Sequence, residues 1–288
     1  MTRSLGRVAA VAAVGAVLCV PGAARAQVGA IGGAAGGAVA GDDAVARAPV
    51  FGESGLVLAA KSWSFGGYYG LTSGSDFVDF TFNQVVLGAF YAPAERLTLG
   101  LVMFPFNSVS SDFGAGLEGD ESGMGDAVAY GKYQFARSAD GRTSVAGIAQ
   151  LLLPIGDADF GAAGTQIALA AAVSHQLSSA TLHGMLGVGI PTDDDDGETA
   201  INFGGGVVFS ASNSVSISGE LLGSSESFDV GLGDSERYTE LNIAPGVRVR
   251  LGDRLFLDTG VIYPLWNNQD SDVKLVDYAF MAGLTFTR

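Results

Sequence analysis

The chain has 288 residues, of which 43 are glycine. Only 16% are charged, well below the roughly 25% that is usual for soluble domains. The formal net charge of −15 argues against a nucleic-acid partner, because phosphate backbones bind basic surfaces. Beyond the N-terminal region there is no continuous apolar run of about 18 or more residues, so no transmembrane helix is expected.

The N-terminal region has the pattern of a secretory signal peptide. Arginines provide its positive charge, residues 8–20 are apolar, and Ala24-Arg25-Ala26 forms a small-x-small cleavage site. We therefore expect a cleaved signal peptide over residues 1–26 and a mature chain that begins at Gln27. Cys19 lies in the removed segment, so the mature chain is expected to contain no disulfide and no thiol chemistry.

The next segment, residues 27–53, is rich in Gly, Ala and Val and has little periodicity. We expect it to be a flexible periplasmic tail, because such a composition buries little apolar surface. The alternative is a small plug that folds into the lumen of a barrel. The barrel itself is expected over residues 54–288, where the sequence pattern changes.

Apolar and polar residues alternate from that point to the C-terminus. The alternation predicts twelve strands, near residues 55–69, 77–91, 96–106, 123–137, 143–155, 164–177, 181–191, 200–210, 214–223, 237–251, 254–266 and 274–288. One of them contains Pro245, which lacks a ladder donor, so a bulge is expected there. Short turns alternate with longer loops, as in an up-and-down barrel of even strand number.

Charge separates the two ends of this predicted barrel. From Asn107 onward the long loops contain 17 acids and no Lys or Arg. The densest run is an acidic mouth formed by Asp193, Asp194, Asp195, Asp196 and Glu198. Arginines and aromatic residues lie near the short turns, and further aromatic residues lie near the long loops. The sequence therefore predicts an all-β transmembrane barrel, up-and-down and antiparallel, with about twelve strands in the outer membrane of a Gram-negative bacterium.

The last strand supports the same assignment. Tyr278, Phe280, Ala282, Leu284 and Phe286 share one face, and this pattern resembles the closing-strand signal of Gram-negative outer-membrane proteins. We therefore expect the barrel-assembly machinery as a partner, together with outer-membrane lipid, lipopolysaccharide and a small-molecule solute.

Three short motifs carry a family resemblance over roughly residues 55–288. They are Gly123-Met124-Gly125-Asp126, Leu153-Pro154-Ile155-Gly156-Asp157 and Leu182-His183-Gly184-Met185-Leu186-Gly187. The chain resembles the outer-membrane transporter family named for the meta-pathway of phenol degradation. The resemblance implies an outer-membrane barrel that acts as a channel for small aromatic or other apolar compounds, without catalytic residues.

The sequence does not favour an enzyme, a metal site or a cofactor. Alternation places His175 on the lipid face and His183 in the lumen, so the two cannot share a metal ion. The acidic run around Gly197 places Thr192 and Phe203 at the first and last ligand positions of an EF-hand, which excludes that site. The run is therefore expected to be a solvated loop, or to bind divalent cations loosely.

The same alternation gives the residues that line the lumen and form a candidate permeation path. They are Lys132, Gln134, Met185, Gly187, Gly189, Asn202, Glu220, Glu240, Asn242 and Arg248. We weigh two explanations for the small residues among them, which are a permeation path and mere ease of strand packing. The interior of a twelve-stranded barrel has a width between that of eight-stranded barrels, which side chains fill, and that of sixteen-stranded barrels, which are open channels.

The leading hypothesis is a passive outer-membrane channel for small neutral or weakly apolar solutes, aromatic compounds among them. The acidic mouth would disfavour anions. The alternative is a structural or surface-interaction barrel whose acidic loops bind cations, lipopolysaccharide or a partner. Conductance of the purified protein in bilayers separates the two hypotheses, because a structural barrel should be closed.

Overall fold

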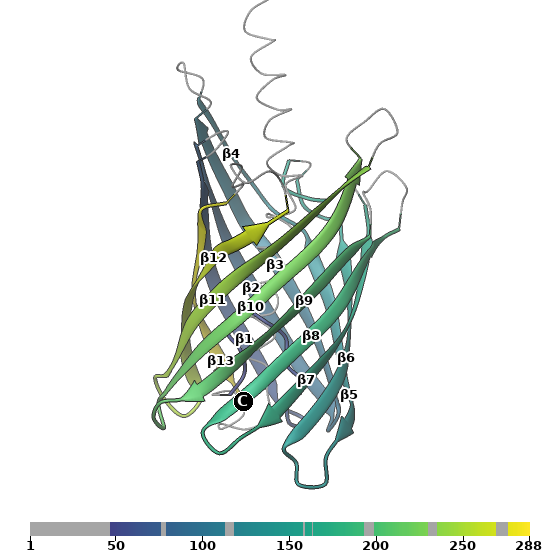
Figure 1. The fold of residues 1–288 in the computed structure, drawn as a ribbon, viewed down its shortest axis with the longest axis vertical. Coiled ribbons are helices and arrows are strands. Elements are labelled where there is room, and N and C mark those ends of the chain that lie inside the picture. The colour runs from purple at the N-terminus through teal and green to yellow at the C-terminus, as the bar shows by residue number, and fades with distance from the viewer. Residues whose placement is uncertain are drawn as a thin grey trace, which may run out of the picture.

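The computed structural model describes residues 47–75, 79–112, 118–157, 159–162, 164–192, 199–229, 235–268 and 276–288, with the backbone alone at 118, 226–229, 235 and 236. The expected signal peptide, residues 1–26, lies outside this part of the chain. No helix in the described part is long and apolar enough to cross a membrane. Figure 1 shows the strands wrapped into one barrel, with the C-terminus at the end opposite the long connections.

Every regular element of the described chain is a β-strand. The strands are β1 (Trp63–Gly74), β2 (Asp79–Ala94), β3 (Leu97–Asp112), β4 (Glu118–Gly123), β5 (Ala127–Arg137), β6 (Thr143–Leu153), β7 (Gln166–Gln176), β8 (Ala180–Pro191), β9 (Ala200–Ser210), β10 (Val215–Asp229), β11 (Ser235–Arg250), β12 (Leu255–Asn267) and β13 (Tyr278–Thr287).

Antiparallel pairing runs around the whole wall and closes it. β1 pairs with β2 on one side and with β13 on the other, so the first and last strands are neighbours. One half of β3 pairs with β4 and the other half with β5, so these two short strands share one position in the wall. The result is a closed twelve-position barrel, which confirms the predicted strand number and antiparallel order.

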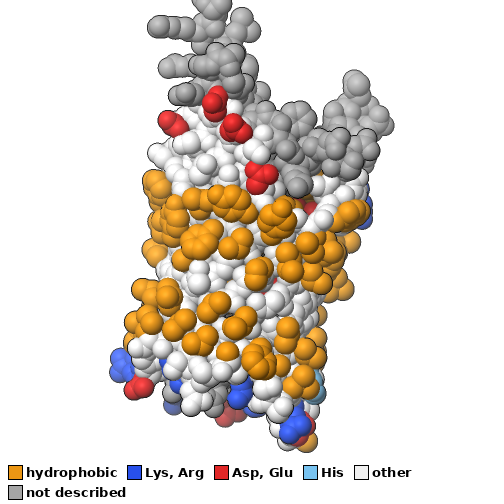
Figure 2. Space-filling model, turned by 60° about the vertical axis from the view of Figure 1, so that its left-hand side comes forward, with side chains coloured by type: hydrophobic (Ala, Val, Ile, Leu, Met, Phe, Trp, Pro, Cys, Tyr) orange, Lys and Arg blue, Asp and Glu red, His pale blue; other side chains and the backbone are white. Residues whose placement is uncertain are grey.

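Side chains alternate strictly between the two faces of the wall. On β8, Leu182 and Leu186 are 45% and 61% exposed, whereas His183 between them is only 8% exposed. Figure 2 shows the result on one side of the molecule, where hydrophobic side chains form a broad band with acids above it and mainly Lys or Arg, together with a few acids, below it. A water-facing wall would be polar, so this outer face is built for lipid.

The short turn between β5 and β6 shows how local chemistry ends a strand. Gly141 has a φ of 72°, in the left-handed region that glycine enters without steric cost. The hydroxyl of Ser138 and the backbone N–H of Arg142 donate to the carboxylate of Asp140. These hydrogen bonds favour the ionised form and lower the pKa of Asp140 below its usual range.

The first strand begins later than the alternation predicts, at Trp63 rather than near residue 55. The chain reverses just before it, where Lys61 has a φ of 65° and the N–H of Ser62 donates to the carbonyl of Ala59 at 3.1 Å. Residues 47–53 are the described part of the segment expected to be a flexible tail, and residues 48–53 are instead buried inside the barrel. This is the arrangement of the alternative expectation, a plug in the lumen.

The prediction of a bulge at Pro245 is wrong, because the irregularity in this strand lies elsewhere. Pro245 pairs with Gly219 of β10 without any shift in register. The irregularity lies instead between Leu241 and Asn242, where β12 carries Leu265 as the extra residue. Pro245 is tolerated because the ladder to β12 is interrupted beside it, so no hydrogen bond from its missing N–H is required.

Candidate functional site

Residues 47–58, the plug, run through the interior of the barrel. Val50 and Phe51 are 2% and 3% exposed and pack in the same core as residues of the wall. Glycines of the wall make room for them, because a Cβ on Gly246 would lie 2.9 Å from the Cβ of Val50. A Cβ on Gly260 would lie 2.5 Å from the ring of Phe51. The wall is therefore shaped to receive this particular segment.

Glu220 of β10 holds the centre of the plug. Its carboxylate accepts hydrogen bonds from the backbone N–H groups of Val50, Phe51 and Gly52, at 2.9, 3.1 and 2.6 Å. These N–H groups have no strand partner, and burying them unpaired would be costly. The buried negative charge is stabilised in return, since each of the three donors points at it.

Two further inward residues hold the start of the plug by its carbonyl groups. Arg248 of β11 donates to the carbonyl of Ala48 at 3.2 Å and forms a buried ion pair with Asp258 of β12. His183 of β8 contacts the carbonyl of Arg47 through Nε2 at 2.8 Å. A carbonyl only accepts, so Nε2 carries the proton, and the other ring nitrogen is free to accept from Ser174 at 2.8 Å.

The end of the plug is held on the opposite side of the lumen. Glu53 of the plug pairs with Lys132 of β5 at 3.1 Å, and the hydroxyl of Tyr130 donates to the same carboxylate oxygen at 3.1 Å. Gln134 donates to the carbonyl of Gly55 at 3.2 Å. The plug is therefore tied to both sides of the barrel by hydrogen bonds and one ion pair, in addition to the peptide chain that leads from it into β1.

The predicted lumen residues divide into three groups. Lys132, Gln134, Glu220 and Arg248 point inward and all contact the plug. Met185, Asn202, Glu240 and Asn242 line a cavity between the plug and the long loops. Gly187 and Gly189 lie outside the lining of this cavity, and a Cβ on Gly187 would lie 2.9 Å from the Cβ of Ala170 on β7.

The cavity has a volume of about 140 Å³. Its floor is formed by Phe51, Gly52 and Glu53 of the plug. Its walls are mostly apolar on β6, β7 and β8 and more polar on β9, β10 and β11. Residues on these walls include Ile148, Gln150, Ala168, Ala170, Met185, Asn202, Leu222, Ser224, Glu240 and Asn242. The barrel therefore contains an amphipathic chamber that the plug closes from one side.

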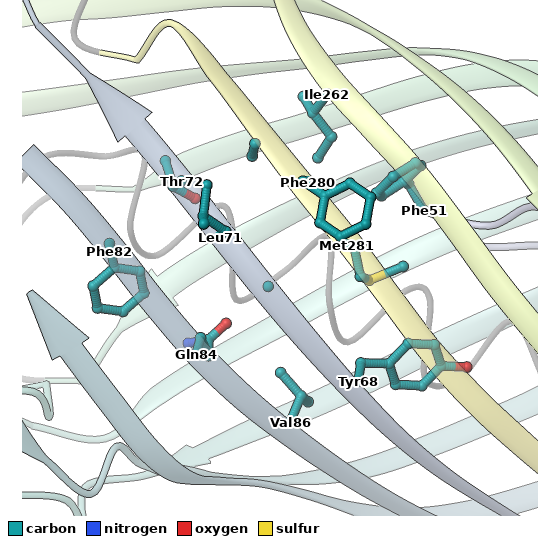
Figure 3. A pocket seen from close by; sticks show the side chains of 12 residues that line it. Phe51, Tyr68, Leu71, Thr72, Phe82, Gln84, Val86, Ile262, Phe280 and Met281 are labelled. Atoms are coloured by element: carbon teal, nitrogen blue, oxygen red, sulfur yellow. The ribbon is translucent and has the colours of Figure 1, made fainter.

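A second pocket of about 30 Å³ lies beside this chamber, near the seam where β1 meets β13. Figure 3 shows its lining, with Phe51 of the plug close to Met281 and Ile262, and Gln84 and Val86 on the other side. The two pockets share Phe51, Thr72, Ile262 and Ala279 in their linings, so they are adjacent. The side chain of Phe51 therefore borders both spaces.

Two of the sequence motifs meet at the loop end of the barrel and form a clasp. Asp126, 2% exposed, accepts from the backbone N–H groups of Gly156 at 3.0 Å and Ala162 at 2.7 Å. Asp157 accepts in turn from the N–H of Met124 at 2.6 Å. The loop after β6 is thereby held against the start of β5, and its Phe160 is buried with Phe82 and Val109.

Sequence reasoning missed several residues of this interior. Glu53 belongs to the segment expected as a tail, and Asp126 was noted only as part of a motif. Asp258 and Ser224 face inward by the same alternation that identified their neighbours, so the pattern could have found them. The five residues of the predicted acidic mouth, Asp193 to Asp196 and Glu198, lie outside the described residues.

The two histidines lie on opposite faces of the wall. His175 is exposed on the outer face and His183 is buried inside, as the alternation predicted. No group of three or more His, Cys, Asp or Glu residues that could hold a metal ion occurs among the described residues. The buried charged side chains of the lumen contact the plug or one another, and buried Asp126 holds the loop after β6.

A closed antiparallel barrel with an apolar outer band and a polar, plugged interior defines the class as an outer-membrane β-barrel. Residues 57–269 match the sequence profile of the family described as "Putative MetA-pathway of phenol degradation". The chain belongs to this family, which confirms the resemblance seen in its motifs. No curated protein sequence matches the chain significantly.

A solved structure confirms the fold. The COG4313 outer membrane channel from Pseudomonas putida F1 is similar with a TM-score of 0.66 at 14% identity, over 81% of this chain and 97% of that one. The NanC porin is less similar, with a TM-score of 0.49 at 10% identity, over 78% of this chain and 98% of that one. At such identities the likeness concerns the fold.

Proposed function

We propose that this protein is a passive outer-membrane channel for small neutral or weakly apolar solutes, aromatic compounds among them, and that the plug closes its path. The chamber of about 140 Å³ inside the barrel carries the proposal. A dry protein cavity of roughly 150 Å³ accepts benzene, so a single ring fits a space of this size. A barrel with a purely structural role would need no empty chamber next to a plug that already closes the lumen.

The way the plug is held supports a gate. Its contacts with Glu220 and Arg248 are hydrogen bonds and its contact with Lys132 is an ion pair, all of which can break and re-form. Water or a solute can replace each partner when the segment leaves the lumen. The similar solved structure is an outer membrane channel and the family is named for a phenol-degradation pathway, and both support a channel.

Deletion of residues 47–58 tests the proposal. The intact protein is expected to conduct ions weakly or not at all in planar bilayers. The protein without residues 47–58 is expected to have a much higher conductance. Cells that carry the intact protein in the outer membrane are expected to take up toluene faster than cells without it. If deletion leaves the conductance unchanged and uptake does not depend on the protein, the barrel is not a channel.

The rival proposal is a structural or surface-interaction barrel, and the tightly held plug favours it. In that case the protein without residues 47–58 would conduct ions, but cells with the intact protein would take up solute no faster than cells without it. The two experiments together therefore separate the hypotheses. Under either proposal, lipid and lipopolysaccharide surround the apolar band, and the outward face of β13 serves recognition by the barrel-assembly machinery.

A further inference from the structure

One wall of the chamber contains a buried hydroxyl without a partner. Ser224 of β10 lines the chamber and is 3% exposed, and its Oγ has no hydrogen-bond partner in the described part of the structure. Its cross-strand neighbours are Asn202 of β9 and Glu240 of β11, which also line the chamber. Buried hydroxyls are nearly always hydrogen-bonded, so this one calls for a partner that the wall does not supply.

The floor of the chamber has a second unsatisfied atom. Glu53 also lines the space, and one of its carboxylate oxygens receives the hydrogen bonds from Lys132 and Tyr130. The other oxygen, Oε1, is buried and accepts no hydrogen bond from any described residue. An unpaired buried acceptor costs free energy, and a donor brought by a bound molecule would remove that cost.

Most of the lining on β6, β7 and β8 is apolar. Side chains of Ile148, Ala170, Met185 and Leu222 belong to the lining and offer hydrocarbon surface to a bound molecule. Two carboxylates, those of Glu53 and Glu240, also border the space. An anion would therefore be opposed by like charges in a poorly screened interior, whereas an uncharged molecule would not.

We propose that the chamber is a binding site for an uncharged, ring-sized molecule that carries one hydroxyl group, such as a phenol or a small cyclic alcohol. The ring packs against the apolar lining, and the hydroxyl pairs with Ser224. Carboxylates of the same ring size are excluded by Glu53 and Glu240. This inference rests on the proposed channel function, because it names the solutes that the channel selects.

Fluorine NMR on the full-length protein in nanodiscs tests the site with three probes of nearly equal size. Para-fluorophenol, para-fluorotoluene and para-fluorobenzoate differ only in whether the ring carries a hydroxyl, a methyl or a carboxylate group. At neutral pH the phenol is uncharged and the benzoate is an anion. Empty nanodiscs of the same lipid provide the baseline for partitioning.

The intact protein is expected to bind para-fluorophenol roughly tenfold more tightly than para-fluorotoluene, which corresponds to one good hydrogen bond. Binding of para-fluorobenzoate should not exceed the baseline. Ser224→Ala should weaken binding of the phenol to the level of the toluene and leave the toluene unchanged. Ser64→Ala is the matched control, because Ser64 is another buried inward serine without a described partner and lies outside the chamber lining.

Equal affinity for phenol and toluene, preferred binding of the benzoate, or no specific binding of any probe would overturn the inference. So would a Ser224→Ala variant that binds the phenol like the intact protein. If that variant does not fold, Ser224→Cys keeps the size of the side chain with a weaker hydrogen-bonding group and should show a smaller loss.

If the site exists but the protein is not a channel, the experiments would give a different combination of results. The phenol would then bind with the dependence on Ser224 described above, but its uptake by cells would not depend on the protein. Protein-dependent uptake of phenol and toluene alike, unaffected by Ser224→Ala, would instead preserve the channel and overturn the site.

Discussion

At the scale of single residues, charged side chains in the barrel interior serve the plug. Glu220 and Arg248 are 4% and 2% exposed, and a charge that is buried so deeply is stable only with compensating partners. The backbone of the plug supplies them as N–H groups for Glu220 and a carbonyl for Arg248. Plug and wall are therefore complementary, and removal of either leaves unsatisfied groups in the other.

Glu220→Ala is expected to release the plug while the barrel remains folded. The change removes the acceptor of three buried N–H groups, each of which costs about 1–3 kcal/mol if left unpaired, less where water can enter. Conductance in planar bilayers should rise toward that of the protein without residues 47–58. Glu220→Gln keeps one acceptor oxygen and should give an intermediate value.

Glu95→Gln provides the control for that experiment, because Glu95 is exposed at the turn end and contacts no plug residue among the described interactions. Its conductance should equal that of the intact protein. A closed channel in the Glu220→Ala protein would show that other contacts hold the plug without this carboxylate.

Neighbouring residues on β8 give a test of the two faces of the wall. Leu186 is 61% exposed on the lipid face, and arginine near the bilayer midplane costs roughly 2–4 kcal/mol. Leu186→Arg should therefore lower the urea midpoint of unfolding in liposomes. Met185→Arg should cost less, because Met185 lines the chamber, where water can solvate the new charge.

The structure changes which lumen residue is suitable for this comparison. The alternation alone would select Gly187, but its added Cβ would lie 2.9 Å from Ala170 and 3.1 Å from the carbonyl of Leu169. Gly187→Arg is therefore expected to lower stability through crowding, independently of the face. If Met185→Arg proves more destabilised than Leu186→Arg, the assignment of the two faces is reversed.

At the scale of elements, the clasp between the loop after β6 and the start of β5 fixes one connection at the loop end. Asp126→Ala should free this loop, because the N–H groups of Gly156 and Ala162 lose their acceptor. Faster hydrogen exchange over 156–162 and earlier proteolysis there are the expected results. The strands should remain folded, since their ladders do not involve this carboxylate.

Asp159→Ala in the same loop is the matched control. Asp159 is exposed, so its removal should leave exchange at 156–162 unchanged. Equal protection in the Asp126→Ala protein would mean that the packing of Phe160 against Phe82 and Val109 holds the loop without the clasp.

At the scale of the whole molecule, the two ends differ in charge. Figure 2 shows acids above the apolar band and mainly basic side chains below it on the face in view. Asp112 and Asp120 are exposed on β3 and β4, at the end from which the long loops leave. Acids around a low-dielectric mouth concentrate cations and repel anions.

The protein without residues 47–58 is therefore expected to prefer cations weakly. Reversal potentials under a salt gradient measure this preference, which should fall as salt rises, because charges are screened over about 10 Å at 0.1 M. Replacing Asp193, Asp194, Asp195 and Asp196 with asparagine should reduce it further. Selectivity for anions in the parent protein would show that interior arginine and lysine residues govern permeation instead.

The sequence by itself determined the barrel and the direction of its side chains. Alternation is a local property of a strand, so the outward position of Leu186 and the inward positions of His183 and Glu220 could be read without a structure. Glycine-rich motifs with Asp126 and Asp157 identified the family for the same reason, because each lies within a few consecutive residues.

Only the tertiary structure decided what fills the lumen. The contacts of Glu220 with the plug join residues separated by about 170 positions in the chain, and the plug has no periodic pattern that would place it. Its position depends on the width of the closed ring, on glycines opposite Val50 and Phe51, and on buried polar groups that must find partners. The unpaired hydroxyl of Ser224 likewise became visible only once all neighbours around the chamber were in place.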